Sequence, residues 1–308
     1  CEDVNEMVNE YGDPEFVTPD FIEEEQTTVN IDEELEINYC PRLIVQSDEP
    51  IDTYNAVDVV SGFFNFHILQ FKNEKDTNYA YEQYKNDANI ISVEYDISYN
   101  AIALNSVETA AISNLTYEDY KKDWYLESTG MDLVLKKYKD QNLPEVVVAV
   151  IDSGVNLDSK YLQDRIRKTG FNNAGDGDEG SEQDYLGHGT KVTSVIANCT
   201  TSNVKISNYR CVTTEGTIES YTLLCSAILQ AISDGANVIN CSLSCSSEFK
   251  LMDKILEYAW SSYCPVFSSS GNYGNDVQFV SGSPLTSSEY MVSVGASTKY
   301  NAPANYTN

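Results

Sequence analysis

The feature that most constrains the fold is an unbroken apolar run, Val-Val-Val-Ala-Val-Ile, at positions 146–151. A run rich in β-branched residues with no polar interruption is typical of a strand buried on both faces of a parallel sheet. Weaker apolar runs predict further strands at 204–212, 238–243, 265–269 and 290–294. Helical periodicity predicts helices between them at 189–198, 221–234 and 249–261. We therefore expect residues 124–308 to form a three-layer, doubly wound α/β fold with a mostly parallel sheet and right-handed crossovers.

A smaller pattern precedes this one. Apolar or alternating segments predict strands at 42–46, 62–71 and 90–95. Helix-forming residues at 79–86 place Tyr81, Tyr84 and Ala88 on one side. We interpret residues 39–104 as a small α+β, ferredoxin-like unit and residues 105–123 as a polar connector.

The amino-terminal segment is acidic. The first 41 residues contain no Lys or Arg, and the whole chain has a formal net charge of −29. We expect residues 1–38 to be a solvated, flexible leader. The charge argues against nucleic acid and anionic membranes as partners. No apolar run is long enough for a membrane span.

The eight cysteines show no spacing typical of a zinc site. Most lie in or beside apolar runs, which favours small buried hydrophobes and mostly free thiols. None has a motif that would activate it as a nucleophile. Cys1 at the start marks either an arbitrary boundary or a lipid-modified cysteine left after signal cleavage.

Three polar residues stand where a catalytic site would form. Asp152 comes directly after the apolar run, and ligand sites in open α/β sheets form at the carboxyl ends of strands. His188 lies between two glycines at a predicted helix start, as the base of a nucleophile–base–orienter system would. Asn272 follows a predicted strand, where its amide can donate to a developing oxyanion. Each alone is more often structural, as we expect for His67, but together and in this order they indicate catalysis.

Four segments resemble successive signatures of the subtilisin family: Val-Ile-Asp-Ser-Gly at 150–154, Gly-His-Gly-Thr at 187–190, Val-Ile-Asn-Cys-Ser-Leu at 238–243 and Ser-Ser-Gly-Asn at 269–272. This resemblance covers residues 124–308 and implies a subtilisin-like serine endopeptidase. It implies that Asp152 orients the imidazole, that His188 is the general base and then the acid, and that Asn272 is the oxyanion donor.

The same resemblance implies a substrate cleft. One wall of the primary pocket would contain Ser242, Leu243 and Ser244. The facing wall would contain Ser269, Ser270 and Gly271. Gly216 would belong to an edge that pairs with the acyl side of a peptide substrate, which is recognition by β-augmentation. Ser244 stands where the family usually has glycine, which predicts a narrower pocket.

Residues 39–104 are similar to the family's inhibitory propeptide in their Arg-Leu-Ile-Val opening and their Ile-Ile-Ser-Val-Glu-Tyr-Asp close. Such a domain would act as an intramolecular inhibitor that blocks the cleft with its carboxyl-terminal stretch. We then expect processing within residues 99–114. The alternative is an accessory domain that stays attached.

The family's nucleophile lies in a Gly-Thr-Ser segment after the oxyanion Asn, and no such segment occurs here. We expect that serine about 30 residues beyond Asn308, judged from the usual triad order. The chain as given would then be inactive.

A loop that often binds calcium in the family is short here, between Asn198 and Arg210, and carries no carboxylate. The acidic run Asp176, Asp178, Glu179, Glu182 and Asp184 is another oxygen-rich candidate for calcium, although a solvated loop is the simpler interpretation. No other cofactor or metal is indicated. The run also suggests a preference for basic substrates and a raised proton affinity of His188.

Two functions compete. The first is an exported serine endopeptidase precursor that hydrolyses polypeptides, located outside the cell or at its surface. The second is an inactive subtilisin-like pseudoprotease that binds peptides or a partner. The sequence does not separate general degradation from the dedicated processing of a peptide precursor.

Overall fold

The computed structural model describes residues 38–101, 124–177, 179–243, 249–272, 288–305 and 307. The chain divides into two units, residues 1–34 and 35–308, and everything described belongs to the second. The predicted acidic leader, apart from residue 38, and the predicted connector at 105–123 lie outside the described residues. Within the described ranges, no helix combines the length and the apolar character that a membrane span requires.

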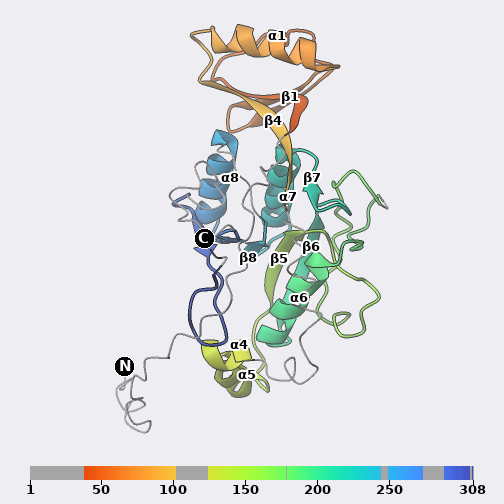
Figure 1. The fold of residues 1–308 in the computed structure, drawn as a ribbon, viewed down its shortest axis with the longest axis vertical. Helices are drawn as coiled ribbons and strands as arrows, with labels where there is room; N and C mark the ends of the chain where they lie inside the picture. Colours follow the sequence, from red (N-terminus) through yellow and green to blue (C-terminus); the bar gives the residue numbers. More distant parts are fainter. Residues whose placement is uncertain are drawn as a thin grey trace. The chain divides into compact units, whose positions relative to one another are not determined.

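A five-stranded parallel sheet is the centre of the larger domain (Figure 1). Its strands run in the order β10 (Met291–Val294), β9 (Val266–Ser269), β8 (Val238–Cys241), β5 (Val146–Asp152) and β6 (Val204–Arg210). All four pairings are parallel. β5 is paired on both sides, and Ala149, Val150 and Ile151 are fully buried. The prediction of a doubly buried strand at this position is confirmed.

Helices cover both faces of the sheet. The helices packed on it are α6 (His188–Cys199), α7 (Tyr221–Ser233) and α8 (Lys250–Ser261), whereas α4 (Trp124–Thr129) and α5 (Met131–Tyr138) contribute no buried residue. Side chains alternate between the two faces of a strand, so Ala149 and Ile151 enter the core beneath α7 and α8. Val150 enters a separate core that also contains Ala197 of α6. These two cores on opposite faces confirm the predicted three-layer arrangement.

The helix α7 illustrates why these segments are helical. Its buried residues recur at helical spacing, through Leu224, Ala227, Ile228 and Ala231. This spacing places them on one stripe that packs against the sheet. The helix ends before Gly235, whose φ of 82° is the left-handed conformation that a glycine adopts at low cost.

Residues 38–101, which lie within the second of these units, form an antiparallel sheet with one helix. We call residues 38–101 the amino-terminal unit. It contains β1 (Asn38–Gln46), β2 (Asp58–Phe63), β3 (Phe66–Gln70), α1 (Glu74–Lys85) and β4 (Ser92–Asn100). The strands run in the order β2, β3, β1, β4. A compact core forms between the sheet and α1 from Leu43, Val45, Leu69, Phe71, Ala80 and Tyr84.

Two local predictions for this unit are wrong. Residues 62–71 form the end of β2, a tight turn and β3, not one strand, because Phe64 and Asn65 have φ angles of 48° and 61°. Two consecutive left-handed residues are the geometry of a two-residue hairpin turn. Helix α1 begins at Glu74, five residues before the predicted start, because the side chain of Asn73 accepts a hydrogen bond from the Asp76 N–H at 3.0 Å. Ala88 is exposed beyond its end.

The last residues of β4 add to the larger domain. Tyr99 and Asn100 pair antiparallel with Ile218 and Thr217 of β7 (Thr217–Ile218). The N–H of Ala101 continues the ladder by donating to the Gly216 carbonyl at 3.0 Å. The edge at which we expect substrate to pair is therefore occupied in this structure by the chain's own residues 99–101.

A buried carboxylate joins the two parts beside this ladder. Asp96 of β4 is fully buried. It accepts hydrogen bonds from Arg42 at 3.1 Å, from the Ser220 hydroxyl at 2.5 Å and from the Thr222 hydroxyl at 2.8 Å. Because Ser220 and Thr222 begin α7, Asp96 places a negative charge at the positive end of that helix.

Glu94 has a similar position at α8 with fewer partners. Its Oε1 accepts from the Lys250 N–H, at the first residue of α8, over 3.4 Å. Its Oε2 is buried and has no hydrogen-bond partner within the described residues. Burial raises the pKa of the Glu94 carboxyl, and the hydrogen bond and charge of Lys250 oppose this only in part.

Glu94→Gln is expected to remove one pH-dependent loss of stability. A carboxyl whose pKa is higher in the folded than in the unfolded chain makes its full contribution to the stability of the fold at pH values below the unfolded pKa of about 4.3. This contribution is lost as the pH rises through the folded pKa. The free energy of unfolding of the Gln variant should therefore exceed that of the parent by more as the pH rises. Urea titrations of the 308-residue chain at a series of pH values measure this difference. The exposed Glu82→Gln serves as a control, and a difference independent of pH would contradict the prediction.

Candidate active site

The structure brings Asp152 and His188 together. Asp152 is the last residue of β5 and is fully buried, and His188 is the first residue of α6 with 27% of its side chain exposed. The Nδ1 atom of His188 lies 2.8 Å from Oδ1 and 2.9 Å from Oδ2 of Asp152. The Ser153 N–H donates to the same Oδ1 at 2.7 Å, which fixes the carboxylate.

Asp152 and His188 lie close together because both are at the carboxyl edge of the sheet. Asp152 ends the strand between β6 and β8, and its carbonyl accepts the Cys211 N–H at 2.9 Å. Two glycines permit the close packing of α6 on the turn after β5. A Cβ on Gly189 would lie 2.2 Å from the Gly154 carbonyl oxygen, and Gly154 itself has a φ of 105°. A larger side chain at Gly189 would displace the helix that begins with His188, and one at Gly154 would collide with the Glu182 carbonyl, 2.4 Å from its Cβ.

This pair has the chemistry of a base and its orienter. A carboxylate that accepts the Nδ1 proton fixes the tautomer of the imidazole and leaves Nε2 as the basic nitrogen. The same carboxylate stabilises the imidazolium that forms when Nε2 takes a proton. The buried side of the pair faces the sheet, and the exposed part of the ring faces solvent from which a substrate can approach.

Asn272 lies at the same edge of the sheet, three residues after the end of β9, and is exposed. It follows Gly271, which is buried and has a φ of 101°. Its place on a strand end agrees with the prediction, whereas its role as an oxyanion donor stays a prediction.

The two predicted walls of the primary pocket are joined directly. The carbonyl of Leu243 accepts hydrogen bonds from the hydroxyls of Ser268 and Ser269, both at 3.2 Å. Leu243 is fully buried, and the Ser242 hydroxyl accepts a hydrogen bond from the Asn240 amide at 3.0 Å. Ser270 and Gly271 are buried beyond β9. Ser244 lies outside the described residues.

The interpretation of the acidic run as a solvated loop is wrong for two of its members. Glu182 and Asp184 are 2% and 9% exposed. Glu182 accepts from the N–H groups of Thr169 and Gly170 at 3.1 and 2.9 Å. Asp176 forms an ion pair with the buried Arg210 at 2.5 Å. Sequence reasoning missed these partners because none of them is adjacent to the run.

These contacts also bear on metal and substrate. In the ranges that the structure describes, no group of three or more His, Cys, Asp or Glu side chains is arranged to hold a metal ion. The negative charge of Asp176 is compensated by Arg210. The suggested preference for basic substrates therefore rests on Glu179, which is exposed, and on Asp178, which lies outside the described residues.

The buried cysteines of the larger domain are expected to be unreactive. Cys211, Cys241 and Cys264 are buried free thiols. Burial raises the pKa of Cys211 and of Cys241, and the charge of Asp152 raises both further. Protonated thiols are poor nucleophiles, so the expectation of inert, buried cysteines is confirmed for these residues.

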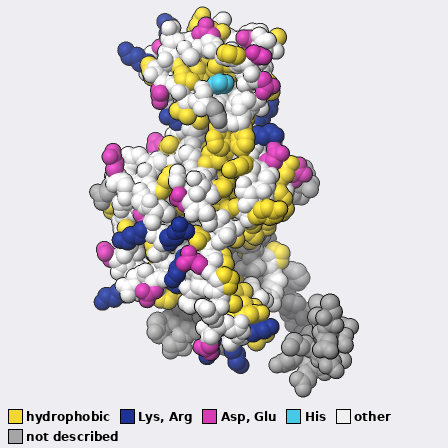
Figure 2. All heavy atoms as spheres, turned by 180° about the vertical axis from the view of Figure 1, so that it is seen from behind, with side chains coloured by type: hydrophobic (Ala, Val, Ile, Leu, Met, Phe, Trp, Pro, Cys, Tyr) yellow, Lys and Arg dark blue, Asp and Glu magenta, His cyan; other side chains and the backbone are white. Residues whose placement is uncertain are grey.

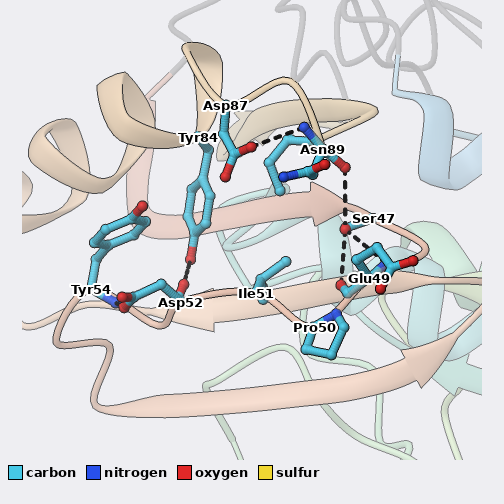
Figure 3. Close-up of a pocket in the computed structure, with 10 residues that line it drawn as sticks. Ser47, Glu49, Pro50, Ile51, Asp52, Tyr54, Tyr84, Asp87 and Asn89 are labelled. Carbon is cyan, nitrogen blue, oxygen red and sulfur yellow. Dashed lines mark hydrogen bonds between the residues drawn. The ribbon is translucent and has the colours of Figure 1, made fainter.

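A separate pocket lies in the amino-terminal unit (Figure 3). It has a volume of about 340 Å³, and Tyr54 and Tyr84 line it together with Asp52, Asp87 and Glu49. Tyr84 donates its hydroxyl to the Asp52 carbonyl across this pocket. All lining residues lie between Ser47 and Ile90, so the pocket is not part of the Asp152–His188 site.

A carboxylate and an imidazole at the carboxyl edge of a parallel α/β sheet form a candidate catalytic site. The model of the subtilase family, peptidase S8, matches residues 144–308, which is more than half of the chain. The chain therefore belongs to the subtilase family of serine proteases.

Individual relatives agree with this assignment. A thermophilic serine proteinase from Bacillus sp. (strain AK1) is 29% identical over 204 residues, which cover 63% of this chain and 45% of that protein. The chain thus spans less than half the length of this curated relative. The solved structure of a lanthipeptide protease is similar with 26% identity and a TM-score of 0.55, over 63% of this chain and 60% of the other.

A second solved structure shares the fold over more of the chain. It is the epidermin leader peptide processing serine protease from Staphylococcus aureus, with a TM-score of 0.64 over 88% of this chain and 73% of that one. The identity is 17%, so this similarity shows the fold alone.

Proposed function

We propose that this chain is the amino-terminal and central part of a serine endopeptidase that hydrolyses peptide bonds through an Asp-His-Ser triad. The observation that supports this most directly is the hydrogen bond of 2.8 Å between His188 Nδ1 and the buried Asp152 carboxylate, in a member of the subtilase family. The nucleophilic serine would follow Asn308 in the full-length protein.

In this mechanism His188 takes the proton of the serine hydroxyl through Nε2 while the hydroxyl oxygen attacks the scissile carbonyl. Asp152 stabilises the imidazolium that results, and it keeps the ring in the correct orientation. Asn272 would donate its amide to the oxyanion of the tetrahedral intermediate. His188 then gives its proton to the leaving amine, and water repeats the sequence on the acyl-enzyme. The walls at residues 242–244 and 269–271 would hold the substrate side chain, and Gly216 would pair with its backbone.

Residues 39–104 would act as an intramolecular inhibitor before processing. Two contacts support this role: β4 is hydrogen-bonded to the 216–218 edge, and Asp96 is buried against the start of α7. A substrate cannot pair with an edge that the chain's own strand occupies. Exported subtilases are made with such domains, so we also propose an extracellular or cell-surface location, with Cys1 as a candidate lipid anchor.

A narrower role is the maturation of a peptide precursor. Of the similar solved structures, one is described as a lanthipeptide protease and one as a leader peptide processing protease. On this hypothesis the full-length protein removes a leader from one dedicated substrate and degrades unrelated polypeptides slowly. Incubation with a mixture of denatured proteins distinguishes the two roles, because a general degradative enzyme would cleave most of them.

Reaction with a fluorophosphonate probe tests the proposed function. The full-length protein, after processing within residues 99–114, should be labelled on one serine after Asn308. Mass spectrometry of the labelled peptide identifies that serine. If a correctly folded and processed protein is not labelled, the pseudoprotease hypothesis replaces the enzyme, and Asp152 and His188 become binding residues.

A further inference from the structure

Helix α6, which begins with His188, lacks a cap of its own. Its N-cap residue is Gly187, with a φ of 92° and no side chain to accept a hydrogen bond. The first N–H groups of a helix have no partner within it and must be satisfied from elsewhere. At the start of this helix the acceptors come from Asp184 and Ser153, which lie outside α6.

Asp184 supplies one of the missing acceptors, to Thr190, and also holds the turn that leads into the helix. The carboxylate is 9% exposed and accepts from the N–H groups of Leu186 at 3.0 Å and Gly187 at 2.7 Å through Oδ1. Its other oxygen accepts from the Thr190 N–H at 2.9 Å and from the Thr190 hydroxyl. A negative charge in this place also lies at the positive end of the helix. Asp184 therefore holds the turn on both sides of His188.

Ser153 connects the same carboxylate to the strand that carries Asp152. The Ser153 hydroxyl donates to Asp184 Oδ1 at 2.9 Å and accepts from the Gly189 N–H at 3.0 Å. The Thr190 hydroxyl adds a second link, because it accepts the Asn156 N–H at 2.9 Å. The residue after Asp152 and the two residues after His188 are thus joined through one buried carboxylate.

We propose that Asp184 is a positioning residue that sets the distance and angle between His188 and Asp152. The proposal rests on the proposed function, in which that pair carries out proton transfer. Asp184 does not touch the reacting atoms, and it acts through the backbone on either side of the imidazole. Ser153 is the relay by which the same group also holds the turn after Asp152.

The first test is Asp184→Asn in the full-length, processed protease. Asparagine has the same shape, but its NH₂ group faces N–H donors, so part of the cluster opens. A displacement of about 1 Å at the reacting groups costs about 100-fold in rate, so we expect kcat to fall by about that factor with KM little changed. Rates are expressed per active site, counted with a fluorophosphonate probe, so that a loss of folded protein is not taken for a slower step.

Glu182→Gln is the matched control. Glu182 is a buried carboxylate two positions away that also accepts two backbone N–H groups, but these belong to Thr169 and Gly170 and not to α6. The control should lose stability by a similar amount and keep its kcat. Equal kcat values per active site in the two variants would overturn the proposal. Should Asp184→Asn fail to fold, Ser153→Ala should move the same quantities in the same direction by a smaller amount.

A second measurement does not require activity. The chain contains two histidines, and His67→Gln assigns the remaining imidazole signals to His188. In the 308-residue chain, an NMR titration of the ring nitrogens should show a lower pKa for His188 in Ser153→Ala, which removes no charge, than in the parent, because a looser contact with Asp152 stabilises the imidazolium less. Identical titrations would contradict the positioning role even in a protein without protease activity. If the probe does not label the parent protease but the His188 titration still shifts in the variant, only the proposed function is contradicted.

Discussion

Replacing His188 by Ala in the full-length, processed protein should lower kcat by about 10⁶-fold, which is the effect that loss of the base has in subtilisin, another member of the family. The loss should be large because His188 is the group that both takes and returns the proton. Hydrolysis of a chromogenic peptide under single-turnover conditions measures it.

Two further variants make this result specific. Asp152→Asn keeps the shape of the orienting group but favours the wrong tautomer, and it should cost about 10⁴-fold. His67→Ala removes the other histidine, which contacts Ser61 in the amino-terminal unit at 2.8 Å, and it should leave the rate of the processed enzyme unchanged. A His188→Ala protein that retains about a tenth of the parent rate would show that a different group is the base.

The second large effect concerns the contact between the amino-terminal unit and α7. Asp96→Ala should destabilise this contact by about 3–5 kcal/mol, because Arg42 would be left beside α7 without the buried carboxylate that it pairs with. The hydroxyls of Ser220 and Thr222 would lose their acceptor at the same time. Urea unfolding of the 308-residue chain measures the change, and limited proteolysis shows whether residues 38–101 are released earlier.

Controls separate this contact from general effects of charge. Glu82→Ala removes an exposed acid of α1 and should change stability by less than about 0.5 kcal/mol. Arg42→Ala should be destabilising as well, and the double variant should cost less than the sum of the two, since both remove the same interaction. Additive effects would mean that the ion pair between Arg42 and Asp96, beside α7, contributes nothing of its own.

Apolar contacts also cross the same junction. Phe64, in the turn between β2 and β3, contacts the Tyr258 ring of α8 with the ring centroids 5.6 Å apart. Figure 2 shows hydrophobic side chains gathered along the middle of one face of the molecule. Apolar contacts of this kind stabilise the junction but are not directional, whereas the hydrogen bonds of Asp96 require one relative orientation of β4 and α7. The polar group is therefore the more sensitive place for a substitution.

The arrangement of the parallel sheet could be predicted because each of its strands is marked by the residues of that strand alone. The run 146–151 has no polar residue, and the alternation of such runs with helical stretches leaves few ways to form a core. Asp152 and His188 could be placed for the same reason, since each stands at the end or start of an element. The hairpin at Phe64 and Asn65 was missed because aromatic residues on both sides extend the strand-like pattern through the turn.

The partners of the buried acids could not be predicted, and the reason is distance along the chain. Asp96 meets Ser220 and Thr222 more than 120 residues later, and Arg210 meets Asp176 34 residues earlier. A carboxylate in a polar stretch has the same appearance whether it faces water or accepts hydrogen bonds. Only the fold decides which of Glu179 and Glu182 is exposed and which is buried.

The hydrogen-bonded ladder between β4 and β7 responds to dilution of the protein differently before and after the chain is cut. While residue 101 remains covalently connected to residue 124, the strand and its edge meet at an effective concentration of the order of millimolar, whatever the concentration of the protein. A cut anywhere between them converts the same hydrogen bonds into an association between two molecules. The occupied edge would then empty as the mixture is diluted, so the timing of that single cleavage, and the volume into which the product is released, would set how quickly the edge becomes available.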